Sequence, residues 1–162
     1  MKRLNISYIK PNIRVLGVHV RELDHLFLVV CVVFRGGKTL DGVISGVFSR
    51  DGITKGVVGL VRESKHYGQV RVIILDDETL PSSSCLDIQL IYEELGLPVI
   101  YLHRGDGFDP RFMTRWRNRV VEPYGLTEGT VERILNLVFD KGVGMLRVAH
   151  LIARNLDLMH NV

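Results

Sequence analysis

Three apolar segments rich in β-branched residues stand close together in the first third of the chain, and they constrain the fold more than any other feature. They cover residues 13–20, 26–34 and 40–48. The tetrapeptide Arg35-Gly36-Gly37-Lys38 between the last two has the flexibility of a hairpin turn. The sequence therefore predicts a three-stranded antiparallel meander.

The rest of the chain alternates between helical and strand patterns. The predicted helices are 53–67, 85–95, 127–140 and 145–159, and the predicted strands are 70–75 and 98–102. The serines of 81–84 are expected to cap the second helix, and the segment after Asp109-Pro110 is predicted to be helical, with a further strand at Val120-Val121 left open. The order β-β-β-α-β-α-β with additional C-terminal helices is that of an α/β, ribonuclease H-like mixed sheet.

Length and composition predict a single domain over residues 1–162. Lys+Arg 21 against Asp+Glu 18 give a formal charge of +3, which permits nucleic acid as a partner without requiring it. The longest apolar run, residues 26–34, is too short for a membrane helix, which needs about 20 residues. No apolar signal core opens the sequence, so a cytoplasmic location is predicted. Cys31 and Cys85 are predicted to be two buried thiols.

One edge of the predicted sheet gathers residues from distant parts of the chain. The first strand lies beside the fourth and parallel to it, so the carboxyl ends of both strands face the edge at which ligands bind. We expect residues 19 and 76 to meet there, with residues 51–55 at the start of the first helix close by.

Several multi-residue blocks occur in a fixed order between about Lys10 and Asn155. They are 13–17, 34–38, 40–43, 64–69, 71–76, 96–100 and 146–153. In these blocks and in their order the chain resembles the endonuclease dU family, uncharacterised archaeal proteins that are distant relatives of endonuclease V.

The resemblance implies a metal-dependent phosphodiesterase that acts on DNA carrying a deaminated base. Two divalent cations, Mg²⁺ or Mn²⁺, activate a water molecule and stabilise the leaving oxygen in such chemistry, and clustered carboxylates hold them. The family pattern has acids at the end of the first strand, at the start of the first helix and at the end of the fourth strand. This chain has His19, Thr54 and Asp76 there, with Val20 in place of a further acid. Of the acids in the family pattern, this chain therefore keeps only Asp76 at the end of the fourth strand.

Two interpretations of this altered site remain open. In the first, the site is rebuilt, and its catalytic residues are Asp76, Asp77 and Glu78. Its metal ligands are then Asp76, His19 and Asp51, and His103 could join this rebuilt site. A decayed site needs no cofactor, and the fold then serves a non-catalytic nucleic-acid-binding or assembly protein. The loss of an anionic ligand and the presence of Lys55 lower the negative charge that attracts divalent cations, which favours decay.

Cationic side chains interleaved with aromatic ones follow the fifth predicted strand. The candidate DNA contacts in this segment are Arg104, Arg111, Arg115, Trp116 and Arg117, accompanied by Phe112 and Arg119. Such a mixture holds phosphates and stacks bases, although a salt-bridged helix face is an equal alternative. Arg35 and Lys38 of the hairpin turn are further candidates, and Asp41 either faces the site or holds a turn. The oligomeric state is left open.

Overall fold

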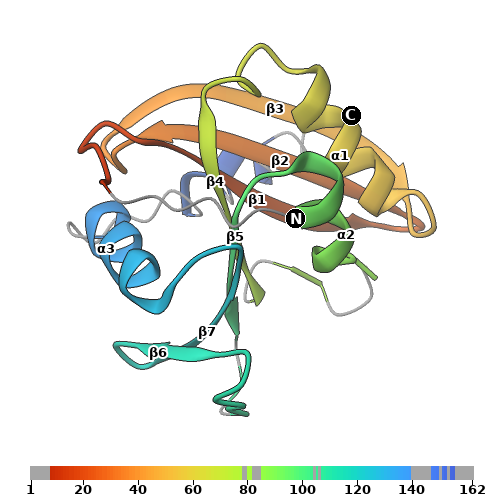
Figure 1. Cartoon of the computed structure of the whole chain (residues 1–162). Coiled ribbons are helices and arrows are strands. Elements are labelled where there is room, and N and C mark those ends of the chain that lie inside the picture. Colours follow the sequence, from red (N-terminus) through yellow and green to blue (C-terminus); the bar gives the residue numbers. More distant parts are fainter. Residues whose placement is uncertain are drawn as a thin grey trace.

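The described strands form a seven-stranded mixed sheet in the order β3-β2-β1-β4-β5-β7-β6 (Figure 1). This computed structural model describes residues 8–77, 80–81, 85–103, 105, 107–139, 147–149, 151–152 and 154–155. The meander and the position of the fourth strand beside the first are as predicted, and the α/β class with a mixed sheet is confirmed.

The first three strands form the predicted antiparallel meander. They are β1 (Arg14–Leu23), β2 (Leu26–Arg35) and β3 (Thr39–Ser49). Their β-branched side chains fit the pleated surface, and β2 is buried along nearly its whole length because the sheet is covered on both faces. Asp24 allows the tight turn between β1 and β2 by taking the left-handed conformation (φ 45°).

Two helices on one face of the sheet lead the chain into parallel strands. α1 (Ile53–Glu63) leads to β4 (Val70–Asp76), which is parallel to β1. α2 (Ile88–Leu95) leads to β5 (Val99–His103), which is parallel to β4. α2 begins later than predicted because Asp87 caps it, accepting a hydrogen bond from the Leu90 N–H at 3.0 Å. The serines expected as caps, Ser82–Ser84, lie outside the described residues.

The Arg-rich segment after β5 contains a β-hairpin, so the prediction of a helix there was wrong. β6 (Thr114–Trp116) pairs with β7 (Arg119–Tyr124), and β7 extends the sheet antiparallel to β5. Arg117 at the turn is left-handed (φ 52°), which a helix does not allow. Val120 and Val121 are buried beside β5, and this burial favours a strand.

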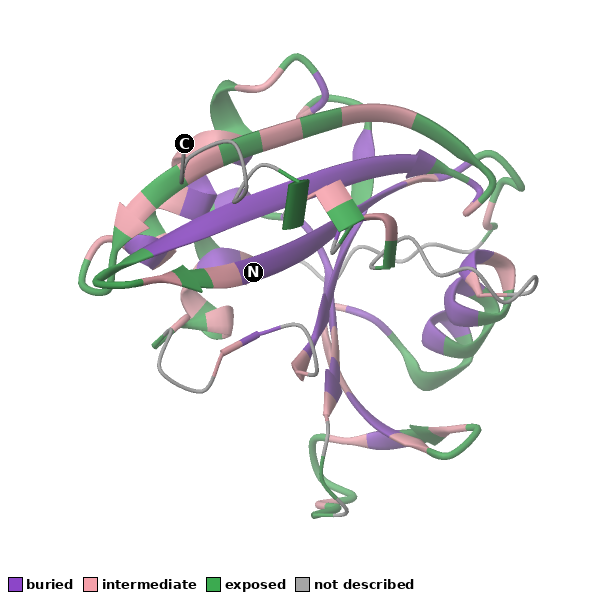
Figure 2. Cartoon of the chain, turned by 180° about the vertical axis from the view of Figure 1, so that it is seen from behind, coloured by how far each residue is buried: buried purple, intermediate pink, exposed green. Residues whose placement is uncertain are grey.

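Apolar side chains fill both sides of the sheet. The central strands are accordingly coloured as buried in Figure 2. α1 and α2 pack on one face, which includes Val18 and Leu75. α3 (Glu128–Val138), capped by Thr127 as predicted, packs on the other face over Ile74. The described residues between 147 and 155 are also helical. None of the described helices is long and apolar enough to span a bilayer.

The two cysteines differ in their surroundings. Cys31 is buried in β2, and burial raises the pKa of its thiol to about 12. Cys85 is exposed in the segment before α2, and its sulfur accepts a hydrogen bond from Arg50 Nε at 3.2 Å. The prediction of two buried thiols was therefore wrong for Cys85, because its segment lies outside the apolar core.

Candidate functional site

His19 and Asp76 lie on adjacent strands at the same level. Val18 and Leu75 are the last paired residues of β1 and β4, and His19 and Asp76 come directly after them. Val18 and Leu75 point to the face of α1 and α2, so His19 and Asp76 belong to the face of α3. Both are buried, with exposed fractions of 5% and 9%. The strand register therefore brings His19 and Asp76 to the same edge of the sheet, as the predicted strand order requires.

Arg119 of β7 binds the carboxylate of Asp76. Its guanidinium donates from Nη2 to Oδ1 at 2.8 Å and from Nη1 to Oδ2 at 3.3 Å, a two-pronged contact. The same side chain donates to the carbonyl oxygens of His103 (3.2 Å) and Leu102 (3.3 Å). Arg119 therefore ties the ends of β4, β5 and β7 together and compensates the charge of Asp76.

The other predicted ligands are directed elsewhere. Asp77 accepts a hydrogen bond from the hydroxyl of Tyr101 at 2.6 Å, and Tyr101 packs on the α2 side of the sheet. Burial and this hydrogen bond raise the pKa of Tyr101. Asp51 is exposed in the turn before α1, which covers the face opposite to Asp76. Glu78 lies outside the described residues.

Two further positions near the predicted site have structural contacts. The Thr54 hydroxyl accepts a hydrogen bond from the Asp87 N–H at 3.0 Å, which links the start of α1 to the start of α2. Nε2 of His103 lies 3.2 Å from Oε2 of Glu122 on the neighbouring strand. These contacts direct the side chain of Thr54 to Asp87 and that of His103 to Glu122, and not to Asp76.

The donor set does not fit the two metal ions that the resemblance implies. Two divalent cations need several carboxylate oxygens directed at one point. Here Asp76 faces a guanidinium, its neighbour on β1 is an imidazole, and Asp77 and Asp51 belong to the other side of the sheet. Within the described part of the chain, no three His, Cys, Asp or Glu side chains form a group that could hold a metal ion.

Two arginines of the hairpin region stack on aromatic rings. The guanidinium carbon of Arg115 lies 4.4 Å from the ring centroid of Phe108, and that of Arg117 lies 4.4 Å from the ring of Trp116. Both arginines are exposed, and neither forms an ion pair with a described carboxylate. The segment is a hairpin and not a helix face, but the alternative of salt-bridged arginines holds for Arg111 and Arg119. Arg104 lies outside the described residues.

The other two candidates in this segment make contacts within the protein. Arg111 forms an ion pair with Asp109 (Nη2 to Oδ2, 2.9 Å), and its hydrogen bonds lower the pKa of Asp109. Trp116 is anchored on α3, since its Nε1 donates to Oδ1 of Asn136 at 2.8 Å. The ring of Trp116 therefore supports Arg117 from a fixed position.

Arg35 and Lys38 lie at the amino end of β1, away from Asp76. Arg35 pairs with Arg14 in the sheet, at the edge opposite to the carboxyl end of β4. Asp41 accepts hydrogen bonds from Nε of Arg35 (2.8 Å) and of Arg14 (3.1 Å), so this carboxylate holds the turn. Contact of Arg35 and Lys38 with DNA stays a prediction.

We expect Asp41→Asn to lower stability at neutral pH but not in acid. Partial burial acts to raise the pKa of Asp41, but the hydrogen bonds and charges of Arg35 and Arg14 outweigh it and keep the pKa below the usual 3.8. A carboxyl with a lowered pKa in the folded state stabilises the fold above its unfolded pKa, and this contribution is lost as the pH falls through the folded value. Urea midpoints of the two proteins should differ at neutral pH and converge in acid. Equal midpoints at neutral pH would contradict the assignment.

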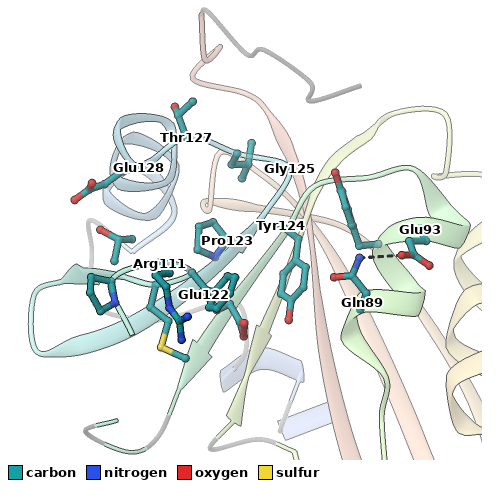
Figure 3. Close-up of a pocket in the computed structure, with 15 residues that line it drawn as sticks. Gln89, Glu93, Arg111, Glu122, Pro123, Tyr124, Gly125, Thr127 and Glu128 are labelled. Carbon is teal, nitrogen blue, oxygen red and sulfur yellow. Dashed lines mark hydrogen bonds between the residues drawn. The ribbon is translucent and has the colours of Figure 1, made fainter. Parts of the chain in front are cut away.

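A cleft of about 870 Å³ opens between α2, the segment before β6, the end of β7 and the start of α3 (Figure 3). Its lining includes the aromatic Tyr92 and Tyr124 and the carboxylates of Glu93, Glu122 and Glu128, together with Arg111. Acidic walls repel phosphates, so the cleft is a poor seat for a nucleic-acid backbone. The cleft was not predicted, because its walls come from three separate segments of the chain, residues 89–93, 110–114 and 122–128. Gly125 before α3 has a left-handed φ of 77° and lies close to the ring of Tyr92.

The chain is similar to several archaeal proteins. The family model described as endonuclease dU matches residues 11–109. A UPF0215 protein of Methanosarcina mazei is 30% identical over 93% of this chain and 94% of its own length. A UPF0215 protein of Methanosarcina barkeri is 40% identical over 62% of this chain and 54% of its own length, so the matched part spans about half of that relative.

A solved structure has the same fold. It is a protein of unknown function from Archaeoglobus fulgidus, which superposes with a TM-score of 0.76 at 24% identity over 88% of this chain and 97% of that one. The family model covers well over half of the chain, and the Methanosarcina mazei relative aligns over nearly all of it. This chain therefore belongs to the endonuclease dU family.

Proposed function

We propose that this chain is a nucleic-acid-binding member of the endonuclease dU family that does not cleave DNA by two-metal chemistry. The observation that carries the proposal is the guanidinium of Arg119 on Asp76, with contacts at 2.8 and 3.3 Å. A cation that the protein itself holds at this carboxylate opposes the binding of a metal ion to the same oxygens.

The hairpin of β6 and β7 is the surface that we propose for nucleic acid. Arg115 and Arg117 present exposed guanidinium groups that already lie over aromatic rings, so they lose little conformational freedom when they bind phosphates. Phe112, which is 60% exposed, adds a ring on which a base can stack. Stacking needs unpaired bases, so single-stranded DNA is the expected ligand.

The double variant Arg115→Ala/Arg117→Ala should bind single-stranded DNA about tenfold more weakly or worse at low salt. Each phosphate contact on a single strand adds about 0.7 to the slope of log affinity against log salt, so the slope should fall by about 1.4. Fluorescence anisotropy of a labelled oligonucleotide over a range of NaCl concentrations measures both quantities.

Arg62→Ala/Arg133→Ala is the matched control, because it removes the same charge from exposed positions on α1 and α3. The control should keep most of the affinity. An equal loss in both double variants would show that the chain attracts DNA through its overall charge, and would contradict a binding surface on the hairpin.

The cleavage part of the proposal has its own test. Oligonucleotides that contain deoxyuridine or deoxyinosine are incubated with the protein and Mg²⁺ or Mn²⁺, and we expect retention of the DNA without nicking. Metal-dependent nicking that disappears in Asp76→Asn would overturn the non-catalytic assignment, whatever the binding result.

A further inference from the structure

β3 is the outermost strand of the sheet, and within the described structure only its β2 side is paired (Figure 1). A strand of 11 residues at an edge presents a row of backbone N–H and C=O groups to an approaching chain. Proteins usually protect such edges with lysine, proline or inward-pointing charges. The sequence from Gly42 to Ser49 contains none of these.

The outer part of this edge is apolar on its exposed face. Leu26, Leu40, Val43 and Val47 are each 41–44% exposed. The β2 partners of the two valines belong to the core on the α3 side, so both valines lie on that face of the sheet. A solvated face of an antiparallel sheet normally carries polar residues at such positions. The valines therefore form an apolar stripe beside the open edge of β3.

The sequence of β3 is complementary to itself about Ser45. When two copies pair antiparallel around this residue, Val43 of one faces Val47 of the other on the exposed face. On the opposite face Ile44 aligns with Gly46 and Phe48 with Gly42, and the side chains of His66 and Leu60 of the same copy already cover these glycines. No charged residue lies between 42 and 49, so the two-fold axis places no like charges opposite each other.

We propose that β3 pairs antiparallel with β3 of a second copy, centred on Ser45, and joins two seven-stranded sheets into one continuous sheet. A two-fold dimer uses the same surface on both partners, and a strand that is complementary to itself fulfils this requirement. The pairing gives the open backbone groups partners and buries the valines. β6 and β7 lie at the other end of the strand order, so the dimer leaves the hairpin accessible and does not depend on the proposed function.

Cysteine crosslinking tests the register directly. In a Cys85→Ser background, where the remaining Cys31 is buried, Ser45→Cys places two thiols opposite each other. Facing residues of antiparallel strands have Cα atoms about 4.5–5.5 Å apart, which suits a disulfide. In Val43→Cys alone, the thiols of the two copies lie about 13 Å apart, because residue 43 faces residue 47, and this variant should stay uncrosslinked. The pair Val43→Cys/Val47→Cys should crosslink like Ser45→Cys.

Light scattering of the unmodified chain supplies the second readout. We expect the mass of a dimer at micromolar concentration, and half that mass for Val47→Lys, which places charges in the interface. Leu151→Lys, at a described position with 49% exposure, is the control and should remain dimeric. A monomeric unmodified chain at high micromolar concentration would overturn the proposal. A dimer that fails to crosslink through residue 45 would overturn it as well.

Discussion

Arg119→Met should lower the free energy of unfolding by about 2–3 kcal/mol. The substitution leaves the Asp76 carboxylate in a buried position without its guanidinium, and removing half of a fully buried ion pair costs about 3–5 kcal/mol. The lower figure applies because the two side chains keep 25% and 13% exposure. In a chain of this length the midpoint of thermal unfolding falls by about 2–4 °C for each kcal/mol, so calorimetry should record a loss of about 4–12 °C.

Two further variants separate this ion pair from the alternatives. Arg62→Met removes the arginine of an exposed pair with Glu94, and should change stability by less than about 1 kcal/mol. Asp76→Asn should destabilise less than Arg119→Met, because Arg119 keeps the carbonyl oxygens of His103 and Leu102 as acceptors. A metal site without its metal behaves in the opposite way, since neutralising one of several clustered carboxylates relieves repulsion. A more stable Asp76→Asn protein would therefore contradict the ion pair as the role of Asp76.

The sheet as far as β5 could be predicted because its signals are local. Apolar runs of strand length, short turns and the Thr127 cap each lie within a few residues. The hairpin has a weaker signal, since β6 has only three residues and the Val120-Val121 pair of β7 is shorter than an apolar run of strand length. Its conformation depends on pairing with β5, which no local pattern reports.

The candidate site, like the fold, could be predicted only in part. The meeting of His19 and Asp76 follows from strand order alone, which the sequence contains. The contact between Arg119 and Asp76 joins residues 43 positions apart, and it requires β7 to lie beside β5. Predicting a helix after Asp109 therefore hid the partner of Asp76, and with it the reason why the carboxylate is a poor metal ligand.

Gly36→Ala should destabilise the fold by about 3 kcal/mol, because the turn from Arg35 to Lys38 is packed and not free. A Cβ atom at Gly36 would clash with the carbonyl oxygen of Pro11, and the φ of Gly36, 59°, is left-handed. Left-handed backbone costs about 1–2 kcal/mol for a residue with a side chain, and overpacking adds about 1–3 kcal/mol. The Gly36 N–H donates to the Ile13 carbonyl at 2.8 Å, so moving the turn to relieve the clash would break this hydrogen bond.

Gly59→Ala in α1 is the matched control and should have the opposite sign. No neighbouring atom lies within 4 Å of a Cβ at Gly59, and alanine in a helix interior is about 1 kcal/mol more favourable than glycine. Urea unfolding of the two variants should therefore move in opposite directions from the unmodified chain. A Gly36→Ala protein as stable as the unmodified chain would contradict the packing of this turn against Pro11. Arg35 and Lys38 would then be on a movable loop, and the hypothesis that this turn contacts DNA would regain support.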